Sequence, residues 1–153
     1  MEKQVNPQPL YPMKWHKFLI YFALWAGAVL NIAYGYRVIE GTPYTGRRPS
    51  IFAYPLPKPI NIIVAILSIC YGIFIIVTRF KLAHFKAAGP KYLTLVYAMG
   101  IVMFLGHIFA IIATTSLTIF NFGIQPITSS AVSIVIIILN RAYYNRRAEL
   151  FVN

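Results

Sequence analysis

The chain has 153 residues, of which 59% are hydrophobic and only 11% are charged. Soluble domains carry about 25% charged residues, so this composition argues against a soluble protein. A net charge of +11 suggests nucleic-acid binding in a soluble protein, but here the basic residues flank apolar blocks, which favours a membrane protein that binds no nucleic acid.

The first apolar block runs from Phe18 to Tyr36 and predicts a transmembrane helix over about 17–36. Lys14 and Lys17, followed by apolar residues and Ala26-Gly27-Ala28, also resemble a cleavable signal peptide. Apolar character continues well past Ala28, which favours an uncleaved helix over that alternative.

The next segment, residues 37–59, contains five prolines and two glycines and cannot form a regular helix. We expect it to be a loop on the outer side of the membrane. Two alternatives remain open for it: a connector that lies on the membrane surface, or a lid or docking surface.

Two further apolar blocks follow. Residues 60–78 contain no charge and predict a helix over about 60–79. The next 49 uncharged residues, 92–140, would measure roughly 74 Å as one helix, more than twice the hydrocarbon core of a bilayer. They therefore predict a hairpin of helices over about 92–116 and 124–144. The chain is expected to form one all-α domain, 1–153, with four transmembrane helices.

Basic residues predict the orientation of these helices. The two termini and the segment between helices two and three carry ten of the Lys and Arg residues, and the proline-rich loop carries four. Because basic segments stay in the cytoplasm, both termini are expected there, in a multi-pass protein of the plasma membrane. The basic residues should also attract anionic lipids. The ten are Lys3, Lys14, Lys17, Arg79, Lys81, Lys86, Lys91, Arg141, Arg146 and Arg147.

A few polar residues fall inside the predicted helices, and none of them is acidic. Counting residues from the helix ends places Asn31, His107, Ser129 and Ser130 at similar depths in the outer half of the bundle. They are candidates for a polar substrate or ion site, or for a proton relay. The alternative is that they form interhelical hydrogen bonds that only stabilise packing.

Small residues recur at four-residue spacing in three of the predicted helices. Such stripes let helix backbones approach closely, either within one chain or between chains. The candidate packing residues are Ala23, Gly27, Gly35, Gly106, Ala110 and Ser133.

The chain lacks the motifs of common membrane enzymes. It has no HExxH, no GxSxG and no Cys-x-x-Cys, and its only cysteine is Cys70. We therefore expect no enzymatic activity, no cofactor and no metal. The leading hypothesis is a subunit or scaffold that associates with itself or with a larger membrane protein. The alternative is an oligomeric transporter or channel with a polar site around Asn31 and His107.

Three stretches carry a resemblance to known proteins: PMKWHKFLIYFALWAGAVLNI (12–32), TRFKLAHFKAAGPKYL (78–93) and LNRAYYNRRAELFVN (139–153). Together they resemble a group of small uncharacterised four-helix membrane proteins of Gram-positive, Firmicutes-type bacteria. The resemblance implies four helices in a bacterial plasma membrane. Some proteins of this kind carry a zinc ribbon before the first helix, but no cysteine precedes that helix here, so the resemblance implies no zinc.

Overall fold

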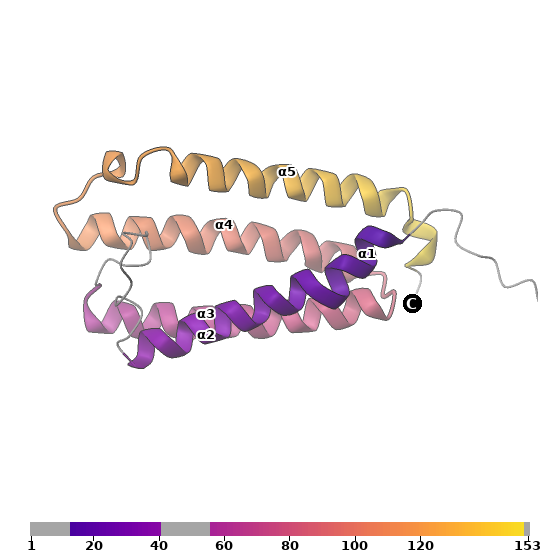
Figure 1. Ribbon diagram of the computed structural model, residues 1–153, viewed down its shortest axis with the longest axis horizontal. Helices are drawn as coiled ribbons and strands as arrows, with labels where there is room; N and C mark the ends of the chain where they lie inside the picture. The colour runs from indigo at the N-terminus through magenta and orange to yellow at the C-terminus, as the bar shows by residue number, and fades with distance from the viewer. Residues whose placement is uncertain (1–12, 41–55, 152–153) are drawn as a thin grey trace, which may run out of the picture.

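The computed structural model describes residues 13–40 and 56–151, and every regular element within them is helical (Figure 1). Four helical stretches are long and apolar enough to cross a membrane: 14–40, 58–83, 89–114 and 125–145. This confirms the expected all-α class with four transmembrane helices. Most of the proline-rich segment, residues 41–55, lies outside the described residues. Its prediction as a connector, or as a lid or docking surface, therefore falls on residues that the structure does not describe.

The helices extend beyond the uncharged blocks that predicted them. Helix α3 spans Lys58–Ala83 and α4 spans Gly89–Thr114, so both include basic residues that the blocks left out. Lys and Arg side chains can continue a helix here because their long stems reach from an apolar surface to water. Helix α5, Gln125–Asn145, follows a short 3-10 turn at Ile119–Phe122, and its proline sits in the first turn, where a missing N–H is harmless.

The first transmembrane stretch is not one regular helix. It comprises α1 (Lys14–Phe18), a π-helical turn η1 (Leu19–Ala23) and α2 (Leu24–Glu40). In the π-helical turn, the Ile20 carbonyl accepts a hydrogen bond from Arg79 Nε at 3.2 Å. A side chain that bonds a helical carbonyl competes with the regular backbone ladder, which is a known cause of local helix distortion.

Helix α2 packs closely along α3 because glycines face the contact from both sides. A Cβ atom added to Gly35 would lie 2.7 Å from the Ala65 carbonyl oxygen, and one added to Gly72 would lie 2.6 Å from Ile32 Cγ1. Only glycine fits at such separations. Gly35 belongs to the small-residue stripe predicted from the sequence, and its partner helix is in the same chain.

Helix α4 packs on α3 and on α5, so that it lies between them (Figure 1). Buried apolar side chains gather into two clusters at opposite ends of the bundle. The larger one includes Leu19, Leu82 and Leu93 near the chain termini, and the smaller one includes Ile108 and Ile111 near the opposite end. The middle of the bundle, between these clusters, is less completely filled.

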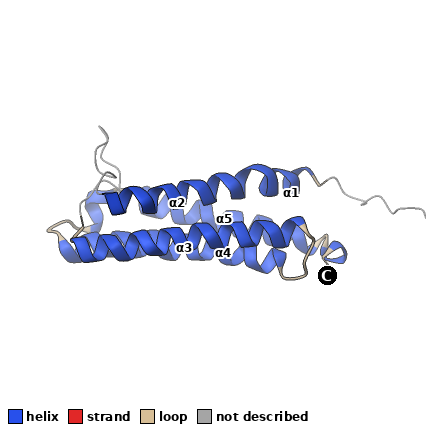
Figure 2. Ribbon diagram, turned by 90° about the horizontal axis from the view of Figure 1, so that it is seen from below, coloured by secondary structure: helices blue, strands red, loops and turns tan. Residues whose placement is uncertain are grey.

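Polar contacts join the two ends of the chain. Trp15 Nε1 donates a hydrogen bond to Asn140 Oδ1 at 2.8 Å, and His16 Nδ1 lies 3.0 Å from the Tyr144 hydroxyl. The Phe151 ring packs edge-on against both His16 and Tyr144. Figures 1 and 2 show the result: α1 lies near the last turns of α5, while α2 runs alongside α3.

Nine basic residues lie at the end of the bundle that holds α1 and the last turns of α5, and we call it the basic end. They are Lys14, Lys17, Arg79, Lys81, Lys86, Lys91, Arg141, Arg146 and Arg147. The beginning of α1 and the end of α5 lie together there because the four helical stretches alternate in direction (Figure 1).

Candidate functional site

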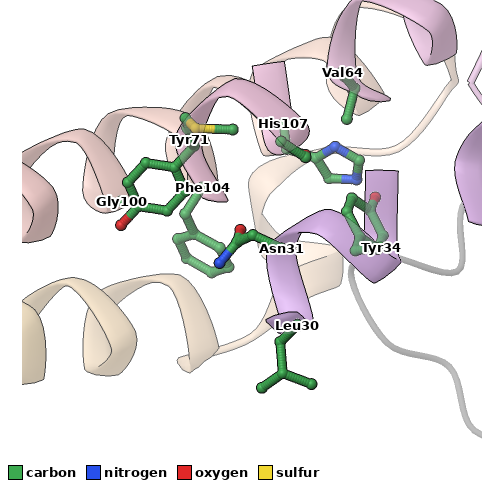
Figure 3. A pocket seen from close by; sticks show the side chains of 10 residues that line it. Leu30, Asn31, Tyr34, Val64, Tyr71, Gly100, Phe104 and His107 are labelled. Atoms are coloured by element: carbon green, nitrogen blue, oxygen red, sulfur yellow. The ribbon is translucent and has the colours of Figure 1, made fainter. Parts of the chain in front are cut away.

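A cavity of about 410 Å³ lies in the middle of the bundle between α2, α3 and α4 (Figure 3). We call it the central cavity. It arises because α2 and α4 both pack against α3 but have no comparable contact with each other in the described part of the chain. Its lining residues are Leu30, Asn31, Tyr34, Val64, Ser68, Tyr71, Gly100, Met103, Phe104 and His107.

Asn31 and His107 come from different helices and line this same cavity. Asn31 Nδ2 donates a hydrogen bond to the Gly27 carbonyl of its own helix at 2.8 Å, which holds the amide in one orientation. The Asn31 carbonyl oxygen is thereby available as an acceptor. The His107 side chain is only 5% exposed and points toward Tyr34 in Figure 3. The cavity therefore combines an amide and an imidazole inside an apolar helix bundle.

Tyr71 and Gly100 form the wall nearer the basic end. The Tyr71 hydroxyl donates to the Val96 carbonyl at 2.8 Å across the α3–α4 contact. A Cβ atom on Gly100 would lie 2.8 Å from that hydroxyl oxygen, so glycine makes room for the bond. This hydrogen bond fixes the orientation of the Tyr71 ring, which lines one side of the cavity. Ser68, which is almost fully buried, also lines the cavity and contributes a hydroxyl group.

The two serines predicted to join this cluster do not line the cavity. Ser129 and Ser130 belong to α5, which contacts α4 and lies on the far side of it from α3. The Ser129 carbonyl accepts a hydrogen bond from the Ser133 hydroxyl at 3.0 Å, a contact within one helix. The four residues that were predicted at one depth therefore do not form one cluster. Asn31 and His107 line the cavity on the α3 side of α4, whereas Ser129 and Ser130 belong to α5 on its other side.

The small residues also divide by environment. Gly27 faces α3 but leaves space for a larger residue, since an added Cβ would lie 3.8 Å from Ile75 Cδ1, an ordinary van der Waals distance. Ala23 packs against the apolar cluster of the basic end and Ala110 against the other cluster. Gly106, in contrast, is exposed, and an added Cβ would meet nothing within 4 Å. The α4 stripe thus includes a glycine that faces away from the other described helices.

Sequence reasoning overlooked several residues. Gly72 makes the closest helix contact together with Gly35, and its four-residue spacing from Ser68 repeats the small-residue pattern seen in the other helices. His16 precedes the first predicted helix and Asn140 lies inside the fourth, and neither was predicted to be buried, yet both are only 2% exposed. The spacing signal could have identified Gly72, whereas the burial of the other two depends on contacts between distant segments.

Within residues 13–40 and 56–151, no group of three or more His, Cys, Asp or Glu side chains could hold a metal ion. Comparisons with protein-family models, curated proteins and solved structures found no match to this chain.

Proposed function

We propose that this chain is a non-enzymatic multi-pass membrane protein that binds a small uncharged ligand in the central cavity, as the recognition step of a transporter or channel. The observation that carries the proposal is the shared lining of one cavity by Asn31 and His107, from α2 and α4. A volume of about 410 Å³ falls within the range of small-molecule sites, roughly 300–1,000 Å³.

The lining argues for an uncharged ligand. No Asp, Glu, Lys or Arg is among the described residues that line the cavity. A charged ligand would lose its hydration on entering and would find no opposite charge there, which is costly in a medium of low polarity. An uncharged ligand with one or two polar groups could instead hydrogen-bond Asn31, Ser68 or His107 while its apolar part contacts Val64 and Phe104.

The proposed location is the plasma membrane of a bacterium, with both termini in the cytoplasm. The gathering of basic residues at the end of the bundle that holds α1 and the last turns of α5 supports this orientation, since basic segments stay on the cytoplasmic side. In this orientation His107, seven residues before the end of α4, lies about 10 Å from the outer end of that helix.

Native mass spectrometry of the protein, extracted gently from its own membranes, tests this proposal. The wild-type chain should retain a small molecule, and His107→Ala should lose most of it because the imidazole no longer contacts the ligand. Ser129→Ala is the matched control, since Ser129 is a polar α5 residue outside the cavity. Equal retention by the wild-type chain and His107→Ala, or an empty wild-type chain, would rule out the proposed ligand site.

A second candidate function is a subunit or scaffold that associates with itself or with another membrane protein. The exposed position of Gly106 favours it, because an added Cβ there meets no described residue within 4 Å, and such a glycine lets another helix approach closely. Gly106→Leu should then dissociate a complex seen in the same mass spectra. Gly27→Leu is less informative, since Gly27 faces α3 of the same chain.

A further inference from the structure

A second hollow lies at the basic end, between the first turns of α4 and the last turns of α5. It has a volume of about 300 Å³, and we call it the α4–α5 pocket. It is separate from the central cavity and shares no lining residue with it. Its lining residues are Pro90, Lys91, Thr94, Arg141, Tyr144 and Asn145.

Several other cations at this end are already engaged. Arg79 donates to a carbonyl of η1 at 3.2 Å, and Arg147 donates to a carbonyl of α5 at 3.0 Å. The Lys81 ammonium lies 4.4 Å from the centre of an α4 aromatic ring. Lys91 and Arg141 are both exposed, come from different helices and line one hollow together. The pocket is therefore lined by two basic residues and has a positive charge at its edge.

The remaining polar side chains of the pocket carry no negative charge that would repel an anion. The Thr94 hydroxyl donates to the Pro90 carbonyl at 3.1 Å, and the Tyr144 hydroxyl pairs with His16 at 3.0 Å. The Asn145 amide can donate further hydrogen bonds. No carboxylate is among the described residues that line the pocket, and the first turn of α4 adds the positive end of a 26-residue helix.

From this arrangement we propose that the α4–α5 pocket binds a phosphate group between Lys91 and Arg141. A guanidinium pairs with two phosphate oxygens at once, and an ammonium supplies a second, compact charge. The pocket lies at the helix ends, the level of lipid headgroups, so an anionic phospholipid is one source of the phosphate. Inorganic phosphate from solution carries the same chemistry and is the other source.

The test uses the full-length protein in detergent, with dioleoylphosphatidylglycerol and inorganic phosphate as separate probes. Binding is measured by native mass spectrometry during titration of each probe. The pocket variant is Lys91→Gln/Arg141→Gln. The matched control, Lys14→Gln/Lys17→Gln, removes the same charge from exposed residues at the same end but outside the pocket. Circular dichroism verifies that each variant is helical, and the single variants Lys91→Gln and Arg141→Gln replace the double variant if it does not fold.

The pocket variant should bind at least one probe about tenfold or more weakly than wild type, while the control loses much less. If millimolar inorganic phosphate displaces the lipid, free phosphate shares the site. If only the lipid binds, the headgroup is the ligand. Equal losses in the pocket variant and the control would indicate a diffuse surface charge and overturn the proposal, as would the absence of binding by both probes.

Discussion

Replacing Gly35 with alanine tests the close contact between α2 and α3. The added Cβ would lie 2.7 Å from the Ala65 carbonyl oxygen, whereas ordinary van der Waals contact begins at 3.4 Å. The helices must therefore separate by several tenths of an ångström, because a backbone oxygen cannot rotate away as a side chain can. Overpacking of this kind costs about 1–3 kcal/mol, so Gly35→Ala should lower the free energy of unfolding by that amount.

Reversible unfolding in mixed detergent micelles, followed by circular dichroism, measures this free energy. Gly106→Ala is the matched control: it makes the same substitution in another membrane helix, at a position where the added Cβ meets nothing within 4 Å. It should be neutral or slightly stabilising, because alanine favours helix over glycine by up to about 1 kcal/mol. If Gly35→Ala unfolds at the same free energy as Gly106→Ala, the close α2–α3 contact does not exist as described.

Three further predictions follow from single contacts. Trp15→Phe should lower the free energy of unfolding by about 1–3 kcal/mol, because the buried Asn140 carbonyl loses its donor; an unchanged thermal midpoint would contradict this. Gly100→Ala should push the Tyr71 ring into the central cavity, and native mass spectrometry should show weaker ligand retention. Arg79→Gln should lower the midpoint of thermal unfolding, because it removes a hydrogen bond to the π-helical turn and the cation–π contacts with Trp25 and Phe80. An unaltered midpoint would show that these contacts contribute no stability.

The sequence predicted the architecture well because bilayer thickness constrains it strongly. Three charge-free blocks, one of them too long for a single crossing, require four helices whatever their side chains contact. The helix ends were predicted less accurately, because residues such as Lys81 and Lys91 extend the helices beyond the uncharged blocks.

The candidate site could be predicted only in part, since residue counting gives depth along a helix but not the direction in which a side chain points. Asn31 and His107 line one cavity because α2 and α4 pack on the same helix, α3. Ser129 lies on α5, beyond α4, although its predicted depth is similar. The order in which the helices pack decides between these outcomes, and it depends on contacts such as those of Gly35 and Gly72.

The contacts at the basic end could not be predicted because they join residues far apart in the chain. Trp15 and Asn140 are separated by 125 positions, and His16 and Tyr144 by 128. In the sequence these residues lie among basic residues, which indicate only the orientation of the helices in the membrane. The π-helical turn could not be predicted either, because it accompanies a hydrogen bond from Arg79, which belongs to another helix.

The central claim, that the cavity between α2, α3 and α4 binds a small uncharged ligand, is tested most directly by a crystal structure. The protein should be purified from its own membranes, crystallised in a lipidic phase and refined with no ligand included. The account predicts continuous density for a small molecule with a polar group within hydrogen-bonding distance of Asn31 or His107. A cavity filled by the protein's own side chains, or one that holds only an alkyl chain with no polar group near these residues, would contradict it.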